Sequence, residues 1–457
     1  MIGQPTSVVI LGGGPGGYEA ALVAVRLGAS VTVVDRDGLG GACVLTDCVP
    51  SKTLISTAGF VTNRALGGDL GVGLPDATVD LAAANRRILD LAEAQSADIA
   101  TRLTGDGVRI VPGAGTLLGA GAVRAVAGDG TAEDLDAEVV LVATGSTPRT
   151  MPTAQPDGER ILTWQQIYSL AELPEHLVVV GSGVTGAELA HAYVGLGAQV
   201  TLVSSRDRVL PGEDAEAATV IEEVFRRDGM QVLGRSRMAS VERTDNGVCV
   251  TLTDGRRVLG SHALLAVGSV PQTAGIGLAE NGIALTESGH IDVDGVSRTS
   301  VRGVYAAGDC TGVLPLASVA AMQGRIAMWH ALGDAVAPLR LDVVSANVFT
   351  SPEIATVGIT QNDVDSERST ARAVMLPLAT NPRAKMDRFT DGFVKVFAQH
   401  GSGMVLGGVV VAPRASELIY PLTVAVQNHL SVDQLSSTFT VYPSMSGSIA
   451  EAARRLH

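Results

Sequence analysis

The residues best suited to redox chemistry lie in one short stretch, GGACVLTDCVPSK, at positions 40–52. It contains Cys43 and Cys48, two of the chain's four cysteines, and it ends at Lys52. In a long chain with so few cysteines, a close pair is more often catalytic or metal-binding than structural. A regular helix places residues five positions apart at roughly 8.6 Å between Cα atoms, whereas a disulfide permits about 4.4 to 6.8 Å. Residues 43–48 are therefore expected to form an irregular turn.

Two other interpretations of this pair are a set of small buried hydrophobic residues and one half of a metal site. The sequence has no further Cys or Cys-x-x-His cluster that would complete a zinc site, so we predict no metal. The remaining cysteines, Cys249 in the alternating run VCVTLTD and Cys310, are interpreted as ordinary core residues.

A glycine-rich turn precedes the cysteines and predicts the element that would position a cofactor beside them. The β-branched run at 7–11 leads into Gly12-x-Gly14-x-x-Gly17, followed by a helical pattern and a strand that ends at Asp35. Glycines in this arrangement let the backbone turn tightly and approach a pyrophosphate at a helix N-terminus. Asp35 can then accept hydrogen bonds from a ribose.

The same pattern occurs a second time and predicts a second dinucleotide. An apolar run at 177–180 leads into Gly181-x-Gly183-x-x-Gly186, a helix to about residue 196 and a strand at 200–203. This strand ends in Ser204, Ser205 and Arg206, with Arg208 nearby, where the first module has an acid. Hydroxyl and guanidinium groups suit a 2′-phosphate, so NADPH is favoured over NADH.

Composition and charge exclude several other classes. The net charge of −14 disfavours a nucleic-acid partner, and no polybasic segment suggests a membrane surface. The N-terminus, MIGQPTSVVILGGGPGG, has no basic region, and its apolar run is too short for a signal peptide or a membrane span. A cytoplasmic protein is expected. At 457 residues with 46% hydrophobic content, the chain should form two to four domains.

Over nearly its whole length the sequence resembles the FAD-dependent pyridine-nucleotide disulfide oxidoreductases, the family of dihydrolipoamide dehydrogenase, glutathione reductase and mercuric reductase. Besides both glycine turns, the stretch at 40–52 looks like the family's redox-active disulfide segment. VYAAGDCTG at 304–312 looks like its second FAD motif, and NVFTSPEIATVG at 347–358 like the start of its dimerisation domain. The resemblance implies an α/β fold with two Rossmann-like dinucleotide-binding domains plus an α+β C-terminal dimerisation domain, in a homodimer.

Four segments are expected on this basis. They are an FAD-binding domain at 1–150, an NAD(P)H-binding domain at 151–268, a return segment of the FAD and central domain at 269–342, and the dimerisation domain at 343–457. Between the glycine turns, the pattern predicts a helix at 88–103 and a strand at 139–142. A comparable strand and turn at 264–268 follow the second glycine-rich module and mark the return of the chain to the first domain.

The resemblance also implies roles for individual residues. Cys43 would be the interchange thiol and Cys48 the thiol against the flavin, while Lys52 would lie near flavin N5 and pair with Glu188. Asp309 would hydrogen-bond the ribityl chain of FAD. Composition supports a specific role for the ammonium group of Lys52, because the chain uses arginine almost everywhere and only three of its 33 Lys and Arg residues are lysines. The residues expected to contact FAD and NADPH, with NADH also possible, are Gly12, Gly14, Gly17, Asp35, Lys52, Ala143, Thr144, Gly145, Asp309, Gly181, Gly183, Gly186, Ser205 and Arg206.

The C-terminal segment departs from the family pattern. Disulfide reductases of this family carry His-Pro-Thr-x-x-Glu, whereas this chain has Tyr442 in place of the His and Gly447 in place of the Glu. A phenol, with an ordinary pKa of about 10, is a poor base at neutral pH, and loss of a general acid-base typically costs about 10² to 10⁴ in rate. Asp47, next to Cys48, should also disfavour its thiolate. Thiol-disulfide exchange is expected to be weak.

We therefore expect an FAD-dependent NAD(P)H:quinone oxidoreductase, similar to the quinone-reductase branch of lipoamide-dehydrogenase-like proteins, with Tyr442 at the acceptor side. Mercuric reductases also have Tyr at this place, but they need a C-terminal cysteine pair, and this chain ends in RRLH. Two alternatives stay open. One is a disulfide reductase that uses Cys43 and Cys48 with a non-standard base, and the other is a non-catalytic flavoprotein that binds a partner.

Overall fold

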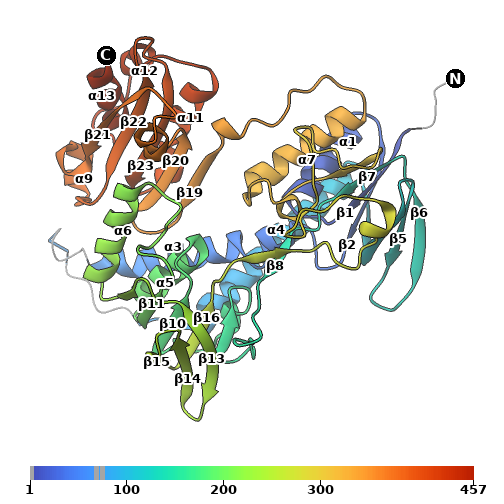
Figure 1. The fold of residues 1–457 in the computed structure, drawn as a ribbon, viewed down its shortest axis with the longest axis horizontal. Helices are drawn as coiled ribbons and strands as arrows, with labels where there is room; N and C mark the ends of the chain where they lie inside the picture. Colours follow the sequence, from blue (N-terminus) through green and yellow to red (C-terminus); the bar gives the residue numbers. More distant parts are fainter. Residues whose placement is uncertain (1–4, 66–70, 73–77) are drawn as a thin grey trace. The chain divides into compact units, whose positions relative to one another are not determined.

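The computed structural model describes residues 5–65, 71–72 and 78–457. The chain divides into two compact units. The first unit contains residues 1–53, 82–149 and 268–339, and the second contains residues 54–81, 150–267 and 340–457. Each unit is therefore assembled from separate stretches of the chain, as the colours in Figure 1 show. None of the helices in the described part of the chain is long and apolar enough to cross a membrane.

The first unit is built on a parallel sheet with the strand order β18-β7-β1-β2-β3. These strands are Val304–Ala306, Val139–Val142, Ser7–Leu11, Ser30–Asp35 and Arg109–Pro112. The central strands β7 and β1 are almost entirely buried, as expected for strands covered on both faces. The sequence pattern predicted β1, β2 and β7, and the structure confirms them.

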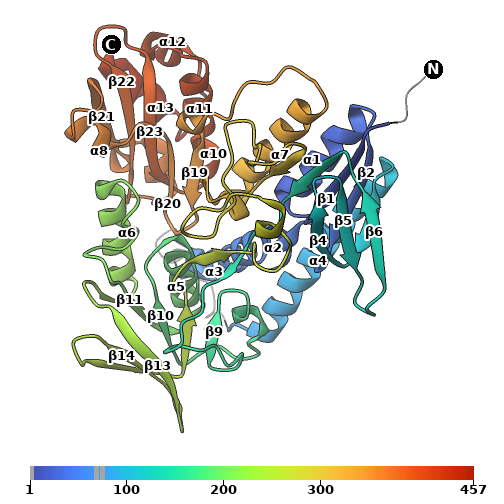
Figure 2. The same cartoon turned by 45° about the vertical axis from the view of Figure 1, so that its right-hand side comes forward.

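Two helices, α1 (Pro15–Arg26) and α7 (Ala317–Ala331), cover one face of this sheet. They lie side by side in both views (Figures 1 and 2) and approach closely, because a Cβ atom at Gly324 would overlap the carbonyl oxygen of Gly16. The long helix α4 (Leu81–Gly105) contains the helix predicted at 88–103.

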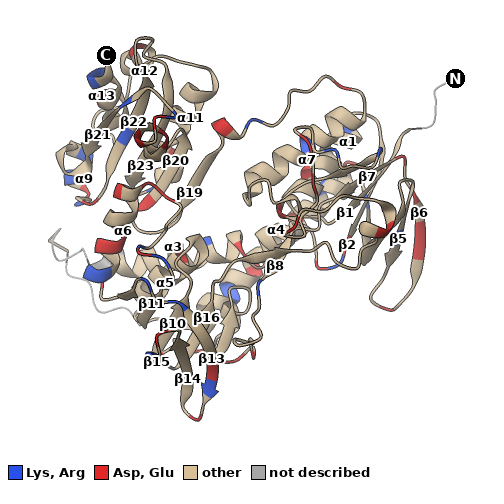
Figure 3. Ribbon diagram, in the orientation of Figure 1, with Lys and Arg blue, Asp and Glu red and all other residues tan. Residues whose placement is uncertain are grey.

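The other face of the sheet packs against a small antiparallel sheet, β4-β5-β6. Its strands are Ala114–Gly119, Ala122–Val126 and Ala132–Asp136. Strand β6 carries exposed acidic residues, and Figure 3 shows their positions in red. Arg109 and Arg124 pair with Glu133 and Asp134 of this strand, so the acids there are balanced locally.

The second unit contains a second parallel sheet, in the order β12-β11-β10-β16-β9. Its strands are Gln231–Leu233, Gln199–Val203, His176–Val180, His262–Leu265 and Ile161–Thr163. The helices α5 (Val184–Leu196) and α6 (Ala215–Arg227) follow β10 and β11, and α5 ends where the sequence predicted. An antiparallel sheet packs against this parallel sheet, and the two share an apolar core. Its strands are β13 (Met238–Thr244), β14 (Gly247–Leu252) and β15 (Arg257–Gly260).

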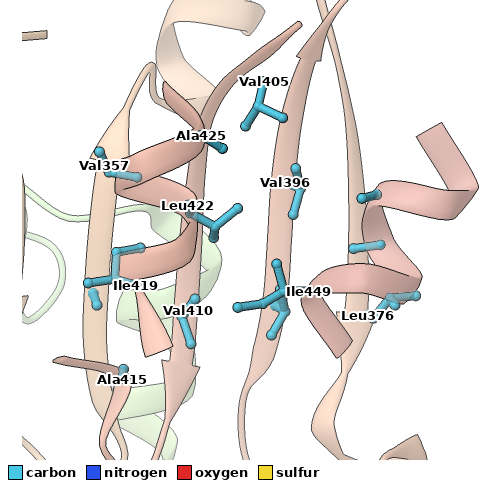
Figure 4. Packing of buried hydrophobic residues seen from close by; sticks show 14 of the residues in the cluster. Val357, Leu376, Val396, Val405, Val410, Ala415, Ile419, Leu422, Ala425 and Ile449 are labelled. Carbon is cyan, nitrogen blue, oxygen red and sulfur yellow. The ribbon is translucent and has the colours of Figure 1, made fainter. Parts of the chain in front are cut away.

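The C-terminal part of the second unit is an antiparallel sheet in the order β19-β20-β23-β22-β21. These strands are Ser345–Val348, Glu353–Gly358, Val405–Ala412, Phe393–Gln399 and Ala371–Pro377. In Figure 4, Leu422 of α11 (Tyr420–Gln427) and Ile449 of α13 (Gly447–Leu456) lie against Val396 and Val410 of the sheet. The predicted class, two Rossmann-like domains with a C-terminal α+β domain, is confirmed. The four segment boundaries remain a prediction.

Buried charge connects this C-terminal sheet to α6. Lys395 of β22 donates to Asp214 at 2.7 Å and also pairs with Glu216. The Lys395 and Asp214 side chains are both almost completely buried. Asp214 is also the N-cap of α6 and accepts the backbone N–H of Glu216 and Ala217. Removing Lys395 would leave the buried Asp214 carboxylate without an opposite charge, which is strongly destabilising.

Candidate functional site: two dinucleotide turns and a dithiol

The first glycine turn joins β1 to α1, and two of its glycines are required by the protein's own backbone. Gly12 has φ of +100°, and a Cβ atom there would overlap the carbonyl oxygen of Ala143. A Cβ atom at Gly17 would overlap the carbonyl oxygen of Gly12. These glycines allow α1 to begin close to the ends of β1 and β7, where parallel α/β sheets bind their ligands.

Gly14 differs from the other two glycines of the turn. It is the N-cap of α1, with φ of −67° and ψ of −175°, and no atom of the described chain lies within 4 Å of the place its Cβ would occupy. The protein itself therefore tolerates a side chain there. The open space faces the first turn of a helix, where free N–H groups and the helix dipole favour a phosphate. This arrangement fits the pyrophosphate of a dinucleotide.

Asp35, at the end of β2, holds the neighbouring loops in place. Its carboxylate accepts the N–H of Gly13 at 2.6 Å, Asp37 at 2.9 Å and Gly38 at 2.7 Å. A carboxylate offers about four acceptor positions, so one remains for another donor. The predicted hydrogen bond with a ribose hydroxyl is compatible with this capacity, and it remains a prediction.

The cysteine pair lies directly beside the first turn. Gly41, the first residue of α2 (Gly41–Leu45), is packed against Gly14, because a Cβ at Gly41 would meet the Cα of Gly14 at 3.0 Å. The helix breaks at Thr46, and α3 (Cys48–Ala65) begins at the second cysteine. The predicted irregular segment between Cys43 and Cys48 is therefore confirmed. Both side chains are partly accessible.

The two thiols are close enough to hydrogen-bond, and this interaction separates their acidities. The hydrogen bond with Cys48 lowers the pKa of Cys43, whereas the same hydrogen bond together with burial raises the pKa of Cys48. The Lys52 ammonium lowers both pKa values, and the Asp47 carboxylate raises both, as the sequence predicted for Cys48. The two pKa shifts therefore have opposite directions, and Cys43 is the more acidic of the two thiols.

The second FAD motif is positioned at the ends of β7 and β18. Asp309, on a short 3₁₀ turn after β18, accepts a hydrogen bond from the Ser146 hydroxyl at 2.8 Å. Thr144 donates to the carbonyl oxygen of Gln272 at 2.7 Å, which fixes the loop that follows β7. Cys310 is fully buried, and burial raises the pKa of its thiol to about 11. The interpretation of Cys310 and of the buried Cys249 as core residues is confirmed.

The second glycine turn, between β10 and α5, repeats the geometry of the first. Gly181 has φ of +112°, and its Cβ would overlap the carbonyl oxygen of Ala266, while a Cβ at Gly186 would overlap that of Gly181. Gly183 is the N-cap of α5, with φ of −71° and ψ of −174°, and no described atom lies within 4 Å of its Cβ position. The turn thus fits a second pyrophosphate in the same way.

In the loop after β11, one polar side chain is buried and holds the loop in place, and two others are exposed to solvent. Ser204 is 0% exposed, and its hydroxyl bonds that of Ser182 at 2.6 Å and accepts the Arg206 N–H at 3.1 Å. It therefore ties this loop to the second glycine turn. Ser205 and Arg206 are exposed, and no carboxylate in the described chain forms an ion pair with Arg206. The predicted contact of these two residues with a 2′-phosphate remains a prediction.

Glu188 lies on α5 and is only 2% exposed. Its Oε1 accepts the backbone N–H of Phe349 at 2.8 Å, a contact that the sequence did not predict. Lys52 belongs to the first unit, where its ammonium donates to the Ser51 hydroxyl at 3.2 Å. The pairing of Lys52 with Glu188 remains a prediction.

The residues that replace the His-Glu dyad lie at the C-terminal end of the second unit. Tyr442 is 83% exposed in the single chain, and Phe439 and Val441 beside it are also exposed. Gly447 begins α13, and the nearest described atom to its Cβ position is Ser444 Oγ at 3.9 Å. The site thus has room for a larger side chain at 447. A cluster of exposed large apolar residues is typical of a surface that a partner covers.

Comparison with known proteins decides the family. Residues 6–324 match the pyridine nucleotide-disulphide oxidoreductase family, and residues 344–453 match the dimerisation domain of that family. The chain belongs to the pyridine nucleotide-disulphide oxidoreductases. It is therefore a flavoprotein oxidoreductase, and the match to the dimerisation domain supports a homodimer.

Individual relatives resemble the chain over almost its full length. It is 56% identical to a Mycobacterium tuberculosis protein named NAD(P)H dehydrogenase (quinone), over 99% of this chain and 94% of the relative. A crystal structure of LpdA from M. tuberculosis, also 56% identical, has a TM-score of 0.96 and covers 99% of this chain and 100% of that chain. A dihydrolipoyl dehydrogenase from Chlorobaculum tepidum is 33% identical over 98% of this chain and 96% of the relative.

The cofactors of this oxidoreductase family are FAD and NAD(P)H, and the two turns described above fit them. In each turn the outer glycines are required by backbone contacts, whereas the middle glycine faces space that the protein leaves open. When bound, the flavin supplies a group that takes up two electrons from a reduced nicotinamide and releases them to an acceptor.

Proposed function

We propose that this oxidoreductase transfers electrons from NADPH to a quinone, without thiol-disulfide exchange. The observation that carries the proposal is the replacement of the His-Glu dyad by Tyr442 and Gly447, since a phenol is in general a poor base at neutral pH. The relative named NAD(P)H dehydrogenase (quinone), at 56% identity, supports the same acceptor class. A quinone accepts two electrons without a protein thiol, so it does not need the missing base.

The chain's own residues would contribute to this reaction in three ways. The open N-caps at Gly14 and Gly183 would receive the two pyrophosphates. Asp309, held by Ser146, would orient the ribityl chain of FAD. Lys52 would place a compact positive charge near flavin N5, where negative charge develops on reduction, and Glu188 would pair with it.

The preferred nicotinamide would be NADPH, because the loop after β11 presents Ser205 and Arg206 in place of an acid. The exposed guanidinium of Arg206 is available for a charge-assisted bond to a 2′-phosphate. We further propose a cytoplasmic location, as expected from the low cysteine content.

The alternative function is disulfide reduction, and the intact cysteine pair favours it. Cys43 and Cys48 lie within hydrogen-bonding reach, and the lowered pKa of Cys43 would favour its thiolate as a nucleophile. Relatives named dihydrolipoyl dehydrogenase, such as the one from C. tepidum, share the fold over almost the whole chain. This function would require another base in place of the dyad.

A comparison of acceptors in Cys48→Ser, Cys43→Ser and wild type tests the proposal. With NADPH and a short-tailed para-quinone, both variants should retain most of the wild-type rate, and wild-type activity with lipoamide should be low. Cys249→Ala, at a buried cysteine outside the pair, controls for general effects of losing a thiol. A fall of about a hundredfold or more in Cys48→Ser would instead show that electrons pass through the pair.

A further inference from the structure

The segment between β19 and β20 is held by two side chains of one helix. Glu188 accepts the N–H of Phe349 at 2.8 Å, and Nδ1 of His191 accepts the N–H of Ser351 at 3.2 Å. Glu188 and His191 are three residues apart on α5, so they lie on the same face of the helix. Residues 349–351 therefore lie along this face, with two backbone donors directed at it.

The surroundings of His191 determine which of its nitrogens carries the proton. Because Nδ1 accepts from Ser351, a neutral imidazole must carry its proton on Nε2. Nε2 lies 3.3 Å from Asp228 Oδ2 and can donate to it. The ring also packs against Phe225 of α6, with centroids 4.8 Å apart, and the side chain is only 10% exposed. His191 is thus held by the end of α6 while it holds Ser351.

This arrangement affects Glu188, because the Phe349 N–H that orients its carboxylate belongs to the same short segment. Thr350, between the two donors, is 3% exposed, and its hydroxyl donates to the carbonyl oxygen of Pro352 at 2.7 Å. The segment is therefore compact, and a displacement of Ser351 would also displace the backbone N–H of Phe349. The buried carboxylate of Glu188 would then lose this hydrogen bond from Phe349.

We propose that His191 is a positioning residue for flavin reduction, acting through Ser351 and Phe349 to fix the carboxylate of Glu188. This inference rests on the role given to Glu188 in the proposed function, and it adds a residue that acts through other residues of the protein. On this proposal, flavin reduction depends on the hydrogen bond that Nδ1 of His191 accepts, and not on the packing of the imidazole ring.

Two substitutions of His191 distinguish the role of Nδ1 from that of Nε2. In His191→Asn the side-chain amide oxygen can occupy the place of Nδ1 and accept from Ser351, whereas in His191→Gln the longer amide reaches the place of Nε2 and meets Asp228. Amide hydrogen exchange of residues 349–351, measured by mass spectrometry, reports the segment directly. Anaerobic reduction of the bound flavin by NADPH, followed by stopped flow, reports the consequence for Glu188 without any acceptor.

In His191→Gln, the amide hydrogens of residues 349–351 should exchange faster than in wild type. NADPH should reduce the flavin of this variant about two- to tenfold more slowly, which is the loss expected for one neutral hydrogen bond. His191→Asn should restore both values toward wild type. His176→Asn is a matched control, since His176 is also a half-buried histidine of the second unit and bonds Thr201 at 2.9 Å, away from residues 349–351. It should change neither measurement.

Equal effects of the Asn and Gln variants would overturn the inference, because the ring would then act only through packing. Faster exchange in His191→Gln with an unchanged reduction rate would also overturn it, provided that Glu188→Ala slows reduction. If Glu188→Ala itself left reduction unchanged, the role of Glu188 in the proposed function would fail, and the role of His191 would fail with it. The exchange data would still show whether His191 holds the segment.

Discussion

Replacing Gly14 with alanine adds one methyl group at the N-cap of α1, in the space that the chain leaves open. The backbone there, at φ of −67° and ψ of −175°, is allowed for alanine, and no described atom lies within 4 Å of the new Cβ. The apoprotein should therefore be as stable as wild type, or more stable by about 0.4 to 1 kcal/mol, because alanine restricts the unfolded chain.

The same methyl group should hold a pyrophosphate away from the N–H groups at the start of α1. Hydrogen bonds to a charged group contribute about 1.5 to 3 kcal/mol each, so the loss of one should raise the Kd of FAD about 10- to 150-fold. The corresponding change at Gly183 should leave FAD bound and weaken NADPH by a similar factor, since the second turn has the same geometry. The two variants are thus matched controls for each other.

The assay compares the FAD content per chain after gel filtration, the Kd for FAD of each apoprotein, and the thermal unfolding of each apoprotein. Gly17→Ala provides a contrast, because its Cβ would overlap the carbonyl oxygen of Gly12 and the fold itself should be damaged. Wild-type affinity of Gly14→Ala for FAD would refute the reasoning. So would a destabilised Gly14→Ala apoprotein, because the open space would then have a structural role.

Three further outcomes are expected. Arg206→Ala should raise the KM for NADPH about 10- to 150-fold with little effect on NADH, by loss of a charge-assisted bond, and equal losses for both nucleotides would exclude a role in reading the 2′-phosphate. Asp309→Ala should lower FAD occupancy, and Ser146→Ala should do so more mildly because it removes only the 2.8 Å bond that holds Asp309; unchanged flavin content in Asp309→Ala would contradict its assignment to the ribityl chain. Tyr442→His combined with Gly447→Glu should raise lipoamide activity, since the space at 447 accepts a side chain, and no gain in a folded, FAD-loaded double variant would show that more than the dyad is missing.

The parts of the site that could be predicted from sequence are those governed by local sterics. Gly12 and Gly17 are recognisable because a tight strand-to-helix turn tolerates no side chain at those positions. The break between Cys43 and Cys48 followed from helix geometry alone. By contrast, Glu188 and Phe349 are 161 residues apart, and His191 and Ser351 are 160 apart. No periodicity or motif relates such residues, because their contact depends on how α5 packs beside β19 and β20.

Ser204 illustrates a different limit of sequence reasoning. Its hydroxyl is one of the polar groups that the sequence shows at the end of β11, but the side chain is fully buried and bonds Ser182. Sequence shows which groups a loop contains, but it does not show which of them turn inward to satisfy buried donors. The neighbours Ser205 and Arg206 are exposed, and the buried Ser204 hydroxyl holds their loop in place, so their contact with a 2′-phosphate stays a prediction.

The residues proposed for flavin reduction and those that replace the dyad lie on different parts of the chain. The glycine turns, Asp309 and Glu188 are fixed by backbone and side-chain contacts that do not involve residues 442–447. The acid-base function of a disulfide reductase can therefore be lost at Tyr442 and Gly447 without disturbing cofactor binding. In the cysteine pair, next to the first turn, the Lys52 ammonium lowers the pKa of both thiols. Under the proposed function, the acceptor reacts with the flavin directly, so no acid-base group is needed to move a proton to or from a thiol.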